Sequence, residues 1–153
     1  MLGISLAACE ESHSCTLVGC GGVEPQLAFV DESEAPVTAS GERRTTSHPE
    51  PRTFQCAGQW APDAGSCGGG LIRFAQVGGN GISRQDVLEL RFLLSDGSFT
   101  EWQSVPLHVE GHTDPDFNGP GCPCSWDDIT FDPLLVPAGA RLDAQGGYLF
   151  PEQ

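Results

Sequence analysis

Basic residues are scarce in this sequence. Seven Lys and Arg stand against 21 Asp and Glu, which gives a formal net charge of −14 and a pI of about 4.3. A chain of that charge repels the phosphates of nucleic acids, so we exclude nucleic-acid binding. The sequence also has no run of about 18 apolar residues, the length that a membrane-spanning helix needs.

Motifs of known catalytic centres are missing as well. There is no G-x-S-x-G nucleophile elbow, and the Gly-rich stretch 78–81 is not followed by the Lys-Ser or Lys-Thr of a phosphate-binding loop. Four histidines are present, but none stands in a recognisable context with a nucleophilic Ser or Cys. We therefore expect a protein that is not an enzyme, with a small hydrolase of unrecognised site as one alternative.

Turn-forming residues, in contrast, are abundant. The chain has 20 Gly and 12 Pro, and few stretches carry helix formers at helical spacing. The clearest element is 86–94, where every second residue from Leu88 to Leu94 is apolar, the period of a half-buried strand. Asp96-Gly97 follows it, and this dipeptide is typical of a hairpin turn.

Other segments repeat this pattern of short strands and turns. We expect further strands at 26–30, 53–57, 71–77, 99–109, 129–131, 134–136 and 148–150. Residues 31–52 are polar and rich in Pro, Ser and Thr, which predicts a long polar loop. Because such a loop is unusual in a compact domain, it can hide a strand near Val37. The pattern predicts an all-β fold, an antiparallel β-sandwich or barrel-like domain.

Near the start of the chain stands Leu6-Ala7-Ala8-Cys9, a branched apolar residue, two small residues and a cysteine. This tetrapeptide resembles the lipobox of bacterial lipoproteins. The resemblance implies a signal peptide, cleavage before Cys9, a lipid on the Cys9 thiol and a further acyl chain, such as palmitate, on the new amino terminus. Two or more acyl chains anchor a protein stably in a membrane.

A full signal has a basic first region and about 7–15 apolar residues. Here only Met1–Ser5 precede the lipobox, with no Lys or Arg, so we expect that an upstream part of the signal is missing. On this interpretation residues 1–8 are a partial lipoprotein signal, 9–14 are a tether between lipid and domain, and 15–153 are a single β domain.

Cysteine parity fits this interpretation. Seven cysteines are present, and six remain once Cys9 is set aside as the lipid acceptor. An even number in an exported chain predicts up to three disulfides. Cys15 with Cys20 and Cys56 with Cys67 are candidate local bridges. Cys122 and Cys124 flank a single Pro, so we expect each of them to reach another cysteine, and the connectivity stays open.

Asp114-Pro115-Asp116-Phe117-Asn118-Gly119 resembles the first half of a calcium-binding loop, as found in EF-hands. Alternate oxygen side chains converge on one hard cation in such loops, and the Gly permits a sharp turn. The predicted calcium ligands are Asp114, Asp116 and Asn118. Ser125 stands where the loop should have its bidentate Glu, although Asp127 and Asp128 lie close enough in sequence to substitute. An ordinary acidic turn is the alternative.

A weaker metal candidate is zinc bound by His108, His112, Cys122 and Cys124, since imidazole and thiolate suit a tetrahedral ion. His-x₃-His at a strand end need not converge, and disulfides would compete for the cysteines. For the three tryptophans we expect packing in the core rather than contact with a carbohydrate or protein. They are Trp60, Trp102 and Trp126.

Taken together, the sequence predicts a non-catalytic lipoprotein of the bacterial cell envelope, exported or held at the outer membrane. Its partners would be the lipid membrane, through Cys9, and an unidentified protein or small ligand. The alternatives are a secreted calcium-binding metalloprotein that uses the loop 114–119, and the small hydrolase. Calcium is the cofactor considered.

Overall fold

The computed structural model describes residues 24–55, 67–68, 71–74, 81–143 and 145–149. Apart from one short 3₁₀ turn, η1 (Ala138–Ala140), the regular elements of these residues are all strands, and the predicted all-β fold is confirmed. The strands are β1 (Gln26–Val30), β2 (Thr38–Thr45), β3 (Arg52–Gln55), β4 (Cys67–Gly68), β5 (Leu71–Arg73), β6 (Leu88–Phe92), β7 (Gln103–Val105), β8 (Leu107–Asp114), β9 (Cys124–Phe131), β10 (Leu134–Leu135) and β11 (Arg141–Leu142).

The described residues fall into two compact units. Gly111–Trp126 belongs to one of them, and residues 24–110 with 127–149 belong to the other. Strands β8 and β9, whose ends enter the smaller unit, pair with each other as a two-stranded sheet. No helix in the described part of the chain is long and apolar enough to cross a membrane.

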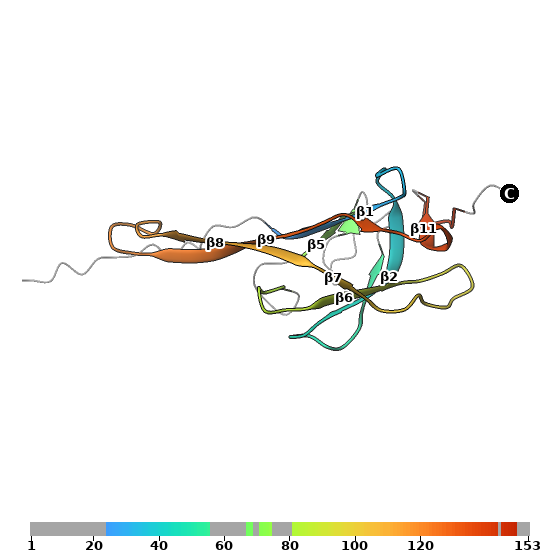
Figure 1. The fold of residues 1–153 in the computed structure, drawn as a ribbon, viewed down its shortest axis with the longest axis horizontal. Coiled ribbons are helices and arrows are strands. Elements are labelled where there is room, and N and C mark those ends of the chain that lie inside the picture. Colours follow the sequence, from blue (N-terminus) through green and yellow to red (C-terminus); the bar gives the residue numbers. More distant parts are fainter. Residues whose placement is uncertain (1–23, 56–66, 69–70, 75–80, 144, 150–153) are drawn as a thin grey trace, which may run out of the picture. The chain divides into compact units, whose positions relative to one another are not determined.

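The larger unit holds two sheets (Figure 1). In the first the strand order is β10-β1-β5-β4, and in the second it is β11-β2-β6-β7, with β3 pairing β2 as well. Their pairings are antiparallel except for that of β1 with β10, which is parallel. Strand β2 is central in the second sheet because β3, β6 and β11 all pair with it.

An aromatic core lies between these two sheets. The ring of Phe29 in β1 has its centroid 5.6 Å from that of Phe54 in β3 and 5.5 Å from that of Phe92 in β6. All three side chains are fully buried, and Leu27, Ile72, Leu88 and Leu90 extend the same cluster. Two sheets that face each other across one core make a sandwich-like fold, as the turn-rich sequence predicted.

The period-two pattern located β6 correctly. Leu88, Leu90 and Phe92 are fully buried, whereas Glu89 and Arg91 between them are only half-buried. The Asp96-Gly97 turn is also present: Gly97 has φ of 83°, and the Leu94 amide donates to the Ser98 carbonyl at 2.8 Å. A positive φ at this position is what favours Gly there.

The expected loop at 31–52 is not a loop throughout: it contains β2, one of the longest described strands, which begins beside Val37, where a hidden strand was expected. Its inward positions are not a row of large apolar residues but include Ala39, Gly41 and Arg43. The guanidinium of Arg43 lies over the Phe74 ring, 4.9 Å from its centroid. Burial, with the charge of Arg52 second, lowers the pKa of Arg43 to about 10.

Candidate functional site

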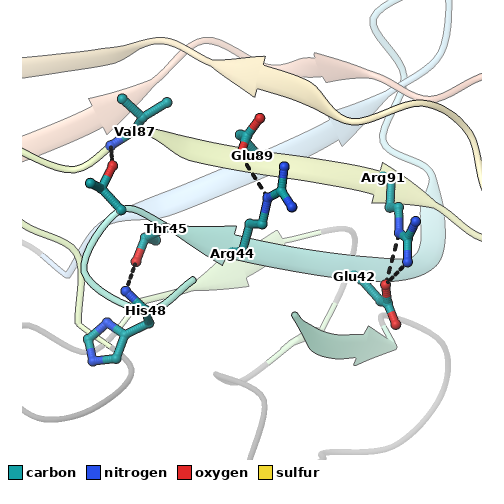
Figure 2. A network of polar contacts seen from close by, with 8 residues as sticks. Glu42, Arg44, Thr45, His48, Val87, Glu89 and Arg91 are labelled. Carbon is teal, nitrogen blue, oxygen red and sulfur yellow. Dashed lines mark hydrogen bonds and ion pairs between the residues drawn. The ribbon is translucent and has the colours of Figure 1, made fainter. Parts of the chain in front are cut away.

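The outward side of β2 and β6 carries two ion pairs in register. Glu42 lies opposite Arg91, and Arg44 lies opposite Glu89. Arg44 donates from Nε to Glu89 at 2.8 Å, and Arg91 donates to Glu42 from Nε at 2.9 Å and from Nη2 at 2.5 Å (Figure 2). Opposite charges directly across an antiparallel pair stabilise the sheet and fix the positions of these long side chains.

Two aromatic rings lie against the same arginines. The Cζ atoms of Arg44 and Arg91 are 4.1 Å and 4.6 Å from the Trp102 ring centroid, and Arg91 is also 4.3 Å from the centroid of Phe99. A planar guanidinium stacks on an aromatic face while it keeps hydrogen bonds in its own plane. We call these six residues the Arg–aromatic face: Glu42, Arg44, Glu89, Arg91, Phe99 and Trp102.

The core packing expected for tryptophan is thus wrong for Trp102. Its side chain is half-buried on the outer side of the sheet, not in the apolar core. Trp126 is also half-buried and stacks on His112, with ring centroids 5.5 Å apart. Trp60 lies outside the described residues.

The face has chemistry to offer a ligand. Its two ion pairs balance two positive with two negative charges, so it is neutral on a chain of net charge −14. Within the described structure, Arg44 donates a side-chain hydrogen bond from Nε alone, and a guanidinium has four further N–H groups on its terminal nitrogens. Planar donors beside fixed rings suit a ligand that has both an apolar face and polar edges.

Asp86 forms hydrogen bonds with the segment that follows β2 and with the segment that precedes β6, the two strands of the Arg–aromatic face. Its Oδ1 accepts from the amide of Ser47, after β2, at 2.8 Å and from the Ser47 hydroxyl. Its Oδ2 accepts from the amide and hydroxyl of Ser83, before β6, at 2.8 and 3.0 Å. Burial by itself would raise the pKa of Asp86, but these hydrogen bonds together outweigh it and lower the pKa below its ordinary value.

A second set of hydrogen bonds shapes the turn that follows β2. The His48 amide donates to Oγ1 of Thr45 at 3.1 Å, and the Val87 amide donates to Oγ1 of Thr46 at 3.0 Å (Figure 2). Both bonds satisfy backbone amides at the place where the strand ladder stops. They hold the end of the sheet next to the Arg44–Glu89 pair.

The predicted calcium ligands lie in the turn between β8 and β9. Asp114 ends β8, and its Oδ1 accepts from the amide of Asp116 at 2.9 Å. Asp116 Oδ1 accepts from the amide of Gly121 at 2.8 Å, and Asn118 Nδ2 lies 3.6 Å from Sγ of Cys124. These side chains organise the turn, and calcium binding by them stays a prediction.

The zinc candidate is not assembled. Cys122 and Cys124 are each disulfide-bonded, so neither is a thiolate ligand. His108 Nε2 lies 3.0 Å from an Asp132 oxygen, on an exposed side chain. Among the described residues, no group of three or more His, Cys, Asp or Glu is placed to hold a metal ion.

Most other cysteine predictions fall outside the described part of the chain. These residues are Cys9, Cys15, Cys20 and Cys56, and the side chain of Cys67 in β4 is likewise not described. The disulfide connectivity therefore remains a prediction.

The Arg–aromatic face was not predicted, although the sequence holds a signal for it. Glu42-Arg43-Arg44 and Glu89-Leu90-Arg91 both read Glu-x-Arg. When two such segments pair antiparallel in register, each Glu meets an Arg of the other strand. The sequence contains no lysine, so all seven of its Lys and Arg positions are arginine, whose planar guanidinium stacks on aromatic rings.

Comparisons with known proteins assign no family to this chain. No family model matches it, no curated protein matches it, and no solved structure matches it.

Proposed function

We propose that the chain is a non-catalytic binding module of a bacterial cell envelope, anchored to a membrane by lipid on Cys9. The observation that carries the binding role is the Arg–aromatic face, where ion pairs hold planar side chains in place on the outside of a sheet. A surface fixed before the ligand arrives loses little side-chain freedom on binding. Such a surface favours binding of a ligand rather than a reaction on it.

Two features support the anchor and the compartment. Leu6-Ala7-Ala8-Cys9 resembles a lipobox, which implies lipid on Cys9. Cys122 and Cys124 are disulfide-bonded, and disulfides persist chiefly outside the reducing cytosol. Together they favour an exported domain on a short lipid tether.

Metabolic labelling with a palmitate analogue tests the anchor. In the bacterium that produces the chain, we expect the wild-type protein to carry label and to sediment with membranes. Cys9→Ser should abolish the label and release the protein into the soluble fraction, because serine has no sulfur to form the thioether bond to the lipid. Cys20→Ser, a cysteine outside the lipobox, is the control and should keep the label. Label on Cys9→Ser would refute the proposed anchor.

A further inference from the structure

A hollow of about 280 Å³ opens next to the Arg–aromatic face. Its wall includes three aromatic residues, the fully buried Phe54 and the more accessible Phe99 and Tyr148, and three uncharged polar side chains, Ser40, Thr53 and Gln55. None of the described residues that line it carries a charge. We call it the neutral hollow. Phe99 belongs to both features, so the hollow and the Arg–aromatic face are continuous.

The two accessible rings of the neutral hollow are each held in place by another residue. Arg91 stacks on Phe99 at 4.3 Å and is itself held by two hydrogen bonds to Glu42. The hydroxyl of Tyr148 lies 3.2 Å from the carbonyl oxygens of Leu93 and Leu94 and donates to them. A ligand therefore meets rings that are already in place, which reduces the entropy lost on binding.

The lining selects the chemistry of the ligand. An anion would be repelled by the chain's net charge of −14, and a cation would find no carboxylate in the described lining. A wholly apolar group would cover Thr53, Gln55 and Ser40 without giving their hydroxyl and amide groups a partner, which is costly. What fits is a neutral molecule with an apolar face for the rings and hydroxyl groups for the polar side chains.

We propose that the neutral hollow binds a single uncharged sugar unit. The C–H face of the sugar lies on Phe99 and Tyr148, and its hydroxyls exchange hydrogen bonds with Thr53 and Gln55. Pockets for small molecules run from about 300 to 1,000 Å³, and the hollow, at about 280 Å³, lies just below this range, so it suits one ring rather than a longer saccharide. This inference deepens the binding role proposed above and rests on it for the setting, an envelope rich in glycans.

The test is an amide-shift titration of the purified, isotope-labelled chain by NMR. The probes are glucose, N-acetylglucosamine and, as a mimic of an aromatic protein side chain, N-acetyl-phenylalaninamide. We expect one or both sugars to cause saturable shifts at Gln55, Phe99 and Gly146, with a Kd of order 1 mM. The proposal is overturned if neither sugar saturates by about 50 mM, far above that Kd. It is also overturned if only the phenylalanine derivative binds, since the hollow would then receive a peptide side chain.

Variants connect the binding to the hollow. Phe99→Ala should raise the Kd for the sugar about tenfold, because it removes one of the two accessible rings on which the sugar lies. Gln55→Ala, on an exposed side chain, should raise it severalfold without disturbing the core. Val87→Ala is the control, since Val87 is 51% exposed and does not line the hollow. Unchanged affinity in both Phe99→Ala and Gln55→Ala would refute the site. The measurement needs no lipid, so its failure and a failure of the Cys9 labelling are separate results.

Discussion

Glu42 and Arg91 lie opposite each other on β2 and β6, and a single Glu42 oxygen accepts from both Nε and Nη2 of Arg91. Their side chains are only 21% and 28% exposed, so water screens the pair in part. Arg91 also lies over Phe99, which lines the neutral hollow. The ion pair thus links the register of two strands to the position of a ring that we propose contacts ligand.

A double-mutant cycle measures the strength of this pair. With Glu42→Gln and Arg91→Gln, we expect a coupling free energy of about 1 kcal/mol, since the pair is charge-assisted and largely shielded from water. Urea unfolding of the four proteins gives the value. The matched control is Arg84 with Asp127, which also makes two hydrogen bonds but whose Arg is 54% exposed, so screening by water should hold its coupling below about 0.5 kcal/mol. Equal coupling in the two cycles would contradict this ranking.

Strand β6 could be predicted from the sequence with its approximate bounds, whereas for β2 only the possibility of a strand near Val37 could be inferred. In β6 every inward residue is a large apolar one, so the period of two is visible locally. In β2 the inward positions include Gly41 and Arg43, which no scale of strand propensity favours as core residues. What makes β2 a strand is its pairing with β3, which follows it along the chain, and with β6, whose contacts are remote in sequence.

Trp102 illustrates the same limit for the candidate site. Its size and apolar character predict burial, and the sequence around it gives no other sign. Its position depends on Arg44 and Arg91, which come from two different strands. Only the register of β2 against β6 brings those arginines to one ring. The Glu-x-Arg repeat was readable, but its meaning required knowing that the two segments pair.

Gly41 is the residue at which β2 tolerates least change. A Cβ built on it would lie 2.0 Å from the Arg91 carbonyl oxygen and 3.0 Å from Cζ of Phe54. The first contact is with backbone of the neighbouring strand, so the sheet itself would have to shift. We expect Gly41→Ala to destabilise the fold by about 3 kcal/mol, the upper part of the range for overpacking.

Thermal or urea unfolding checks this, with Gly139→Ala as the control. A Cβ on Gly139 would lie 3.7 Å from Cδ2 of Leu94, an ordinary contact, so the change in stability should stay within about 0.5 kcal/mol. If Gly41→Ala unfolded at the same urea concentration as Gly139→Ala, the close approach of β2 to β6 at this position would be wrong.

Asp86 uses both carboxylate oxygens, one for Ser47 and one for Ser83. In Asp86→Asn one of these serines would face the NH₂ group of the amide, which only donates hydrogen bonds. The serine hydroxyl can rotate and accept from it, but the serine backbone N–H would lose its acceptor. We expect a loss of about 2 kcal/mol in the free energy of unfolding. The control is Asp96→Asn, because Asp96 accepts from Ser98 through Oδ1 alone and an amide oxygen can replace it. A loss no larger than that of the control would contradict the role of Asp86.

The pH dependence of stability gives an independent reading of Asp86. Its pKa in the folded chain is lowered, since its hydrogen bonds outweigh the opposing effect of burial. Folding therefore favours the ionised form, and the stability that it contributes is present above its unfolded pKa of about 3.9 and is lost as pH falls through the lower folded value.

The pKa values of Asp31 and Asp96 are also lowered, by hydrogen bonds from Ser33 and Ser98, but these groups titrate equally in wild type and Asp86→Asn. The difference in unfolding free energy between the two proteins should thus be constant above about pH 5 and shrink below about pH 4. Urea midpoints across this range measure the difference. If it stayed constant down to about pH 2.5, the pKa of Asp86 in the folded chain would not be lower than its pKa in the unfolded chain.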